Sequence, residues 1–442
     1  MAHAGWRTAT ATTGTPRTRQ PAHRAEHGAS MATNDTPAAS PTSNGEIPAT
    51  CVAPKGFRFA TTGAGFRKSG RDDLALVVSD TPAVAAAVFT KNLFQAAPVL
   101  VARDILARAP KARAVLINSG QANACTGDEG LTNCRATLAL VAAATGLAPQ
   151  DILPASTGVI GAQLPMDKWT AAVPALAADL GKKGPEDFAK AIMTTDAFPK
   201  FASRTVELSG GTVTLVGMAK GAGMICPNMA TMLATVLCDA DVEPAAWQAL
   251  FRDAVDATFN RVTVDGDTST NDTVFGLANG ASGVAALGTD LAVLGAALTG
   301  VLGDVAYMLV KDGEGATKVI HINVAGARDD ADAELAARTV GHSQLVKTAM
   351  YGRDANWGRI VAALGRSGAT FNPAAVIVSL CGVELFRGGQ PTNLDFDALL
   401  KEPLAGRDIV VNIMLGNGPG SYRLLASDLT HDYVSCNADY RS

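Results

Sequence analysis

The chain contains the stretch Lys220-Gly221-Ala222-Gly223-Met224-Ile225-Cys226-Pro227-Asn228-Met229-Ala230-Thr231-Met232-Leu233. Its first part is rich in glycine, which is typical of a flexible loop. From Thr231 to Leu237 the residues are apolar, which is typical of a core strand. A hydroxyl side chain therefore lies where a loop meets a buried strand.

This position suits a nucleophile that cuts its own chain. A threonine hydroxyl is a weak nucleophile and needs a base. Attack of the Thr231 oxygen on the carbonyl of Ala230 would convert the peptide into an ester, and hydrolysis of the ester would free the α-amine of Thr231. That amine has an ordinary pKa of about 8 and can itself serve as the base. Taken alone, the same pattern also fits a turn that leads into a buried strand.

The remaining sequence alternates between strand-like and helix-like segments. Strands are expected at residues 84–89, 114–117, 212–218, 319–324, 375–380 and 409–414, and helices at 128–143 and 244–259. A chain of 442 residues is too long for one ordinary core, so we expect two lobes. The fold class is therefore α/β (mixed α+β), with mixed sheets.

The composition excludes several classes of function. Hydrophobic residues make up 48% and charged residues 18% of the chain, as in globular proteins. The net charge of -4 offers no basic excess for nucleic acid. The apolar run from Leu291 to Gly303 is shorter than the ~20 residues of a membrane span and predicts a buried helix, so we expect no membrane partner. The seven cysteines form no CxxC pair, and free thiols are expected rather than disulfides or a metal site.

The first 46 residues differ from the rest. They are rich in Thr, Ala, Pro and Arg and poor in large apolar residues, so a disordered tail is expected for residues 1–46. Arginines in this part weakly favour an organellar transit peptide, whereas Pro16 and Pro21 oppose the helix such a peptide needs. We expect an overlong start or a dispensable tail, and a cytoplasmic protein.

Two glycine-rich pieces invite a dinucleotide interpretation. They are Gly63-Ala64-Gly65 with Gly70, and Gly416-Asn417-Gly418-Pro419-Gly420. Neither has the full fingerprint spacing, and Pro419 fits poorly at a helix start on a phosphate. Turns are the better prediction for both.

The stretch from Lys220 to Leu233 closely resembles the cleavage segment of the ornithine acetyltransferase (glutamate N-acetyltransferase) family, which is cut between Ala and Thr. Other segments match that family in the same order, from about residue 50 to the end. They are residues 117–124, 156–161, 193–196, 264–272, 311–318, 351–359 and 437–442. Two positions depart from the pattern: Ala197 stands where a Thr is expected, and Cys436 where an apolar residue is usual.

The resemblance implies a self-processing, N-terminal-nucleophile-like fold and an acetyl transfer in arginine biosynthesis. Residues 47–230 would form an alpha chain and residues 231–442 a beta chain, assembled as a heterotetramer with two of each. Thr231 would take the acetyl group from N-acetyl-ornithine and pass it to glutamate. No cofactor is implied, although some members also use acetyl-CoA as a donor, and no residue here decides that question.

The resemblance also implies the site residues. Thr157 and Gly158 would form the oxyanion hole, although Ser156-Thr157-Gly158 taken alone is typical of an ordinary turn. The contacts to substrate would come from Thr195, Lys220, Thr231, Glu314, Asn437 and Ser442. Thr194 competes with Thr195 for one contact, and we choose Thr195. Taken alone, Lys220 fits a solvated surface lysine, Glu314 a turn residue, and the last six residues a loose tail.

Two other classes of function remain open. Related self-cleaving folds carry aminopeptidases, and fold alone does not separate transfer from hydrolysis. A non-catalytic binding protein could also use this scaffold, and it would be recovered uncut. No histidine triad or metal cluster is visible in the sequence.

Overall fold

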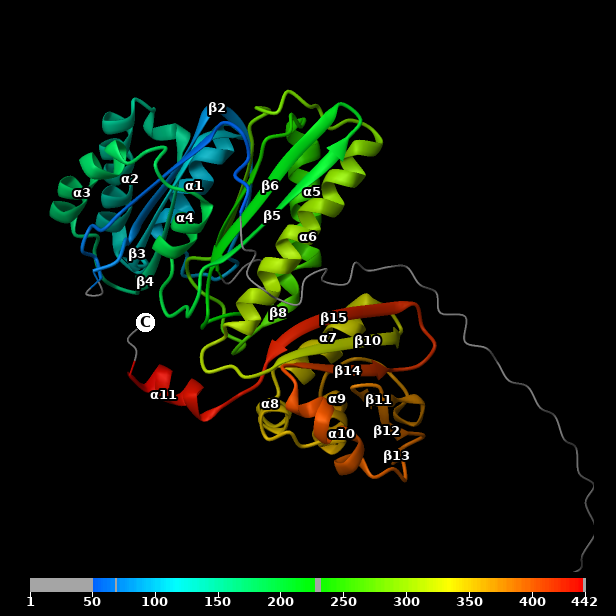
Figure 1. Cartoon of the computed structure of the whole chain (residues 1–442). Helices are drawn as coiled ribbons and strands as arrows, with labels where there is room; N and C mark the ends of the chain where they lie inside the picture. The colour runs from blue at the N-terminus through cyan, green and yellow to red at the C-terminus, as the bar shows by residue number, and fades with distance from the viewer. Residues whose placement is uncertain (1–50, 68–69, 227–231, 440–442) are drawn as a thin grey trace, which may run out of the picture. The chain divides into compact units, whose positions relative to one another are not determined.

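The computed structural model describes residues 51–67, 70–226 and 232–439. Two sheets organise this part of the chain (Figure 1). Each sheet has its own set of helices, so the expected mixed α/β class with mixed sheets is confirmed. The predicted disordered tail, residues 1–46, lies outside the described residues.

The first sheet has eight strands in the order β4-β3-β2-β9-β7-β6-β5, with β1 paired to β2. Two neighbouring pairs, β3 with β4 and β7 with β9, are parallel, and the others are antiparallel. Its strands are β1 (Phe57–Thr62), β2 (Leu74–Phe89), β3 (Lys111–Gln121), β4 (Ile152–Val159), β5 (Lys200–Leu208), β6 (Gly211–Lys220), β7 (Leu233–Cys238) and β9 (Thr273–Ala278). Strands in the middle of the sheet, such as β7, are buried along their whole length because both faces are covered.

Helices cover both faces of this sheet. One face carries α1 (Ala97–Arg108), α2 (Gly127–Thr145), α3 (Met166–Ala178) and α4 (Pro185–Ala191), and Trp169 and Phe188 are buried in their shared core. The other face carries α5 (Pro244–Ala257) and α6 (Thr289–Lys311), with Trp247 and Phe251 in a second core. Helix α6 is long and apolar enough to cross a membrane, but it is largely buried against the sheet and α5. It is the predicted buried helix.

The second sheet has seven strands in the order β13-β12-β11-β14-β10-β15-β8. Its strands are β8 (Val262–Thr263), β10 (Val319–Ala327), β11 (Ile377–Leu380), β12 (Val383–Arg387), β13 (Gln390–Pro391), β14 (Asp408–Met414) and β15 (Gly420–Ser427). Its helices are α7 (Asp330–Gly341), α8 (Gln344–Tyr351), α9 (Trp357–Gly365) and α10 (Phe396–Ala405). A third core joins these elements, and the short helix α11 (His431–Asp439) follows β15.

Most predicted elements exist, with shifted ends. The strand expected at 84–89 is the second half of the longer β2, and the one expected at 375–380 begins at Ile377 after a 3-10 turn. The helix expected at 244–259 ends at Ala257. Residues Ser156–Gly158 lie in strand β4 and not in a turn, so that simpler interpretation is wrong.

The glycines after β14 serve close packing. A Cβ built on Gly418 would lie 1.9 Å from the carbonyl oxygen of Ala327, and one on Gly420 would lie 2.2 Å from the same atom of Asp329. The backbone between β14 and β15 therefore passes directly against the end of β10. The glycine-rich run, predicted as a turn, thus connects β14 to β15, and its glycines allow this close approach.

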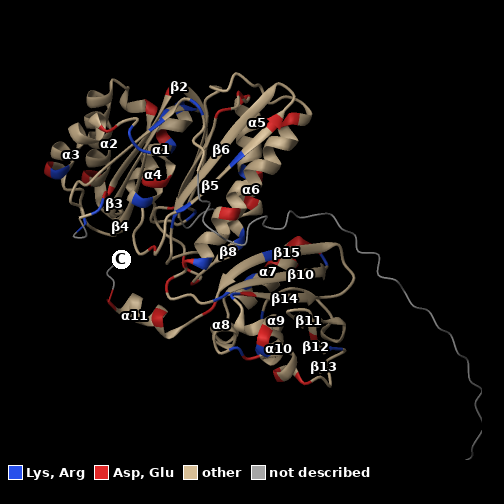
Figure 2. Cartoon of the chain, viewed as in Figure 1, with Lys and Arg blue, Asp and Glu red and all other residues tan. Residues whose placement is uncertain are grey.

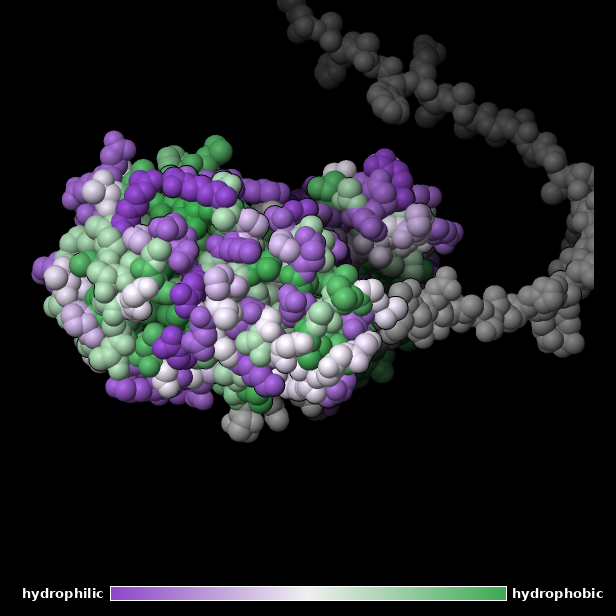
Figure 3. All heavy atoms as spheres, turned by 90° about the horizontal axis from the view of Figure 1, so that it is seen from above, coloured by the Kyte–Doolittle hydropathy of each residue, from purple (hydrophilic) through white to green (hydrophobic). Residues whose placement is uncertain are grey.

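Charges of both signs are interspersed along the elements around both sheets (Figure 2). On the face seen from above, hydrophobic residues lie in small areas between hydrophilic ones (Figure 3). All seven cysteines are free thiols, as expected.

Candidate active site

One cavity lies where the ends of several elements of the first sheet meet the turn after α6 and the helix α11. Its lining comes from eight separate stretches of the chain. The lining residues are Ala122, Thr157, Gly158, Ile160, Thr194, Thr195, Lys220, Gly223, Met224, Met232, Leu233, Ser269, Thr270, Asn271, Asp272, Glu314 and Asn437. Six residues predicted for the site, Thr157, Gly158, Thr195, Lys220, Glu314 and Asn437, are among them.

Thr157 and Gly158 lie at the end of β4, beside Gly120 of β3. Gly158 has φ +133°, and a Cβ there would lie 2.3 Å from the carbonyl carbon of Gly120. Only glycine fits this backbone and this spacing. The side-chain oxygen of Thr157 accepts a hydrogen bond from Nζ of Lys220 at 3.3 Å. Since a hydroxyl can accept and donate at once, its hydrogen is left to point elsewhere.

Lys220 is the last residue of β6, opposite Leu233 at the start of β7. Its side chain is buried, so the simpler interpretation as a solvated surface lysine is wrong. Burial lowers the pKa of Lys220, while the carboxylates of Asp196, Asp272 and Glu314 oppose that shift. The result is a buried amine among carboxylates at the cavity wall.

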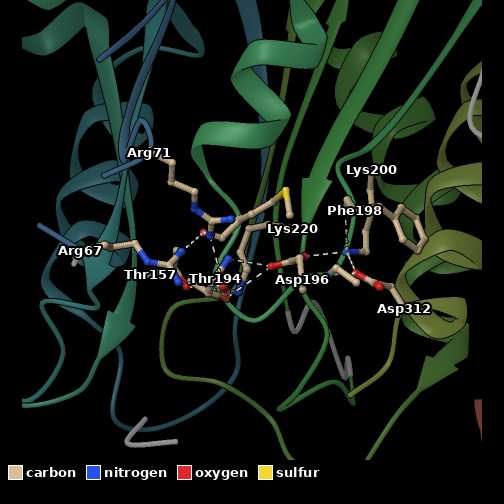
Figure 4. A network of polar contacts seen from close by, with 12 residues as sticks. Arg67, Arg71, Thr157, Thr194, Asp196, Phe198, Lys200, Lys220 and Asp312 are labelled. Carbon is tan, nitrogen blue, oxygen red and sulfur yellow. Dashed lines mark hydrogen bonds and ion pairs between the residues drawn. The ribbon is translucent and has the colours of Figure 1, made fainter. Parts of the chain in front are cut away.

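The loop with Thr194 and Thr195 is held from two sides. Asp196 Oδ2 accepts a hydrogen bond from the backbone nitrogen of Thr194 at 2.8 Å. The guanidinium groups of Arg67 and Arg71 donate to the carbonyl oxygens of Met193 and Thr194 (Figure 4). Because both threonines line the cavity, the choice of Thr195 over Thr194 stays a prediction.

Asp265 holds the loop that precedes the predicted cleavage bond. Its carboxylate accepts from the backbone nitrogens of Met224 at 2.6 Å and Ile225 at 2.9 Å. Met224 has φ +55°, which is unusual for a residue with a side chain. Ala230 and Thr231, the predicted cleavage residues, lie outside the described residues, and the next residue along the chain, Met232, lines the cavity.

Glu314 and Asn437 close another side of the cavity. Asn437 Nδ2 donates to Oε2 of Glu314 at 2.9 Å, although 123 positions separate the two residues. Gly315 has φ +66° and packs directly on the start of α11, where a Cβ would lie 2.4 Å from the nitrogen of Tyr433. Thr430 Oγ1 also donates to the Gly315 carbonyl oxygen at 2.7 Å. These contacts position α11 against the turn that carries Glu314.

Ser442 lies outside the described residues. The departures at Ala197 and Cys436 both fall on exposed positions. Ala197 contributes only its backbone nitrogen, which donates to Asp312 Oδ2 at 3.0 Å, so its side chain has no part in that contact.

The sequence interpretation missed some of the polar framework. Asn271 Nδ2 donates to the carbonyl oxygens of Ala122 at 2.6 Å and Ser156 at 2.8 Å, which fixes the strand ends that carry the predicted oxyanion hole. Asn271 lies within segment 264–272, which matches the family, so the sequence could have identified it. Lys200 has no motif around it and could not have been found that way.

Within residues 51–67, 70–226 and 232–439, no group of three or more His, Cys, Asp or Glu side chains is arranged to hold a metal ion. The cavity wall instead offers an ammonium group, carboxylates, a side-chain amide and hydroxyls. Such a set can bind a small zwitterion through charge and hydrogen bonds.

Comparison with known proteins gives consistent matches. The model of the ArgJ family matches residues 58–442. The arginine biosynthesis bifunctional protein ArgJ of Nitratidesulfovibrio vulgaris is 74% identical over 391 residues, which cover 88% of this chain and 100% of that protein. The protein of the same name from Geobacter sulfurreducens is 48% identical over 394 residues, covering 88% of this chain and 99% of that protein.

A solved structure of ornithine acetyltransferase from Mycobacterium tuberculosis, complexed with ornithine, is 44% identical and covers 40% of this chain and 93% of that one, with a TM-score of 0.37. The family match spans most of the chain, and the relatives are matched over essentially their whole length. The predicted resemblance and the prediction of an arginine-biosynthesis enzyme are thereby confirmed. The chain belongs to the ArgJ family.

Proposed function

We propose that this enzyme transfers the acetyl group of N-acetyl-ornithine to glutamate, through an acetyl ester on Thr231, after cutting its own chain between Ala230 and Thr231. The observation that carries the proposal is the cavity itself. Six residues implied by the family resemblance reach it from five separate parts of the chain, and Met232, the neighbour of Thr231, lines it too.

In the first half-reaction the Thr231 oxygen bonds to the acetyl carbon, and the amide bond to ornithine breaks. The free α-amine of Thr231 takes the hydroxyl proton and gives it to the departing amine of ornithine. In the second half-reaction the amine of glutamate attacks the ester, the bond from the acetyl carbon to the threonine oxygen breaks, and a proton returns to that oxygen. Two easier steps thus replace one difficult amide exchange.

Each half-reaction passes through a tetrahedral oxyanion. The proposed donors to it are the hydroxyl of Thr157 and the backbone nitrogen of Gly158. Lys220 donates to the Thr157 oxygen, which supports a hydroxyl hydrogen free to meet the oxyanion. Donors fixed before the reaction stabilise developing charge by a few kcal/mol, here about 3 kcal/mol for one donor.

The other polar groups suit the two amino-acid substrates. Both carry an α-carboxylate, for which Lys220 offers an ammonium group. Ornithine also carries an ammonium group, for which Glu314 offers a carboxylate. Asn437, held by Glu314, can bond either charge through its amide. Thr195 and Ser442 complete the proposed substrate contacts.

The proposal extends to the assembly of the enzyme. The cut chain would consist of an alpha chain, residues 47–230, and a beta chain, residues 231–442, paired as a heterotetramer in the cytoplasm. The relatives are named bifunctional, and use of acetyl-CoA as a second acetyl donor to glutamate would give this enzyme two activities. The enzyme would need no other cofactor.

The experiment that tests the function separates transfer from hydrolysis. Purified enzyme is incubated with N-acetyl-ornithine, with and without glutamate, and acetate and acetyl-glutamate are measured. A transferase forms acetyl-glutamate at a rate far above that of acetate release. If acetate formed at the same rate with and without glutamate, the enzyme would be a hydrolase and the proposal would be wrong.

A further inference from the structure

Lys200, the first residue of β5, is fully buried. Its Nζ lies 2.6 Å from Oδ1 of Asp196 and 2.5 Å from Oδ2 of Asp312 (Figure 4). The ammonium also lies over the ring of Phe198, 5.1 Å from its centre. A lysine is rarely buried so completely unless it is paired, and here it joins two carboxylates from segments more than a hundred positions apart.

The two carboxylates hold backbone nitrogens in the cavity wall or next to it, because Thr194 lines the cavity and Gly221 follows the lining residue Lys220. Asp196 Oδ1 accepts from Gly221 at 2.6 Å, and Oδ2 accepts from Thr194 at 2.8 Å. Asp312 Oδ2 accepts from Ala197 at 3.0 Å. Oδ1 of Asp196 and Oδ2 of Asp312 therefore each bind both the lysine and a backbone nitrogen.

Each segment tied in this way carries a proposed substrate contact. Thr195 immediately precedes Asp196, Lys220 immediately precedes Gly221, and Glu314 follows Asp312 by two positions. Lys200 touches none of these three side chains through any described hydrogen bond, and it does not line the cavity. Its effect on them would pass through the two carboxylates.

The charge of Lys200 favours the ionised form of both Asp196 and Asp312. Burial would raise the pKa of Asp196, but Lys200, Lys220 and the hydrogen bond from Gly221 hold that pKa well below its ordinary value. Burial raises the pKa of Asp312, and Lys200 opposes that shift. Loss of the lysine would leave two buried carboxylates without the ammonium group that they share.

We propose that Lys200 is a positioning residue, which sets the relative placement of Thr195, Lys220 and Glu314 by bridging Asp196 to Asp312. The inference rests on the proposed function for the identity of the substrate. A buried ion pair often adds little net stability compared with apolar residues of the same volume. The directional bonds of Lys200 do fix the spacing of the two segments that they join. That spacing sets how far apart the groups that bind the two charged substrates lie.

The test compares Lys200→Met with Lys318→Met. Lys318 is also buried, and its Nζ donates to the carbonyl oxygens of Leu404, Ala405 and Gly406 at the end of α10, away from the cavity. We expect Lys200→Met to raise KM for N-acetyl-ornithine at least about tenfold, with kcat within about threefold. Lys318→Met should lower the melting temperature and leave KM unchanged. An unchanged KM in Lys200→Met would overturn the inference.

A second variant keeps the test decisive if Lys200→Met folds poorly. Lys200→Met/Asp312→Asn removes one unpaired buried carboxylate and should recover much of the melting temperature, while KM stays raised because the ammonium group that joins Asp196 to Asp312 is still missing. If KM returned to the wild-type value together with stability, Lys200 would act on stability alone.

Direct binding separates this inference from the proposed function. The Kd of ornithine, measured by calorimetry, needs no turnover, and we expect Lys200→Met to raise it by a factor similar to that on KM. If the wild type bound ornithine but transferred no acetyl group, the proposed function would fail, and the effect of Lys200 on Kd would still decide this inference. An unchanged Kd in the variant would overturn it.

Discussion

Asn437 donates a hydrogen bond to Glu314 at the cavity wall, although the two residues lie 123 positions apart. The last described turn of the chain is therefore part of the cavity and not a loose end. The contact fixes an amide and a carboxylate side by side, where an incoming ammonium or carboxylate group can meet both. Because neither group belongs to the cleavage loop, binding and self-processing can be tested separately.

Asn437→Ala should raise KM for N-acetyl-ornithine and for glutamate by about tenfold, since the proposed hydrogen bond from the Asn437 amide to a charged group of the substrate is lost. Self-cleavage should stay complete because it needs no substrate. Initial rates over a range of each substrate, with a denaturing gel of the same sample, measure both. Cys436→Ser, an exposed neighbour on the same helix, is the control and should match the wild type. If Asn437→Ala showed wild-type kinetics, Asn437 would not be a substrate contact.

Thr231→Ala should abolish both cleavage and turnover, and Thr231→Ser should retain some of each because it keeps the hydroxyl. A denaturing gel with N-terminal sequencing should show, in the wild type only, a second chain that begins at Thr231. Mass spectrometry after brief exposure to N-acetyl-ornithine should find an acetyl group on that chain. Fully active wild-type enzyme recovered as one intact chain would contradict the proposed processing.

Thr157→Ala should lower kcat by about 100-fold with a smaller change in KM, because an oxyanion donor acts chiefly in the transition state. Steady-state rates after confirmed cleavage measure this effect. Thr170→Ala on α3, which removes an exposed hydroxyl bonded to its own helix, is the control. A change confined to KM would make Thr157 a contact to the bound substrate instead.

Gly158→Ala should destabilise the enzyme strongly, by at least about 2 kcal/mol, because the new Cβ meets the backbone of Gly120 and the residue has a positive φ. Gly161→Ala is the matched control: its φ is +84°, but a Cβ there meets nothing within 4 Å. It should cost about 1 kcal/mol from backbone strain alone. Chemical unfolding of both variants gives the comparison, and equal losses would show that the contact with Gly120 is unimportant.

His342 should make stability fall in acid. Burial lowers its pKa to about 4, and the charges of Arg338, Lys347 and Arg366 add to the effect. Between pH 6.5 and pH 4 the unfolded chain binds a proton at this position that the folded enzyme does not, so stability falls as the pH falls through this window. His342→Asn should show a shallower loss of unfolding free energy between pH 6.5 and pH 4. Identical slopes for variant and wild type would contradict this account.

The sequence predicted the residues that line the cavity far better than the buried residues that hold them in place. Lys220, Glu314 and Asn437 were predicted because they lie in segments that match a family, and all three line the cavity. Lys200 was missed because its importance depends on a tertiary contact between the start of β5 and the end of α6, which no local pattern encodes. Taken alone, Ser156–Gly158 is typical of a turn because these residues are small or carry a hydroxyl, and their place in β4 depends on pairing with β3.

Hydrophobic periodicity predicts secondary structure best for long elements with a clear apolar face. The prediction of helix α5 is right within two residues because its large apolar side chains recur at helical spacing, and two of them, Trp247 and Phe251, are buried. Element ends were less accurate. The strand at Ile377 begins later than predicted because Pro373 starts a 3-10 turn just before it.

The order of strands in the first sheet also governs how the enzyme comes apart. Strands β9 and β7, which follow the predicted cut, lie between β2 and β6, which precede it. Once the bond before Thr231 is broken, unfolding separates each beta chain from its alpha chain, so the midpoint of unfolding should depend more steeply on protein concentration than that of the uncut Thr231→Ala enzyme. Refolding the cut enzyme must then insert two strands of one chain into a gap in the other. The uncut chain should therefore fold more easily than the two separated chains can refold after the cut.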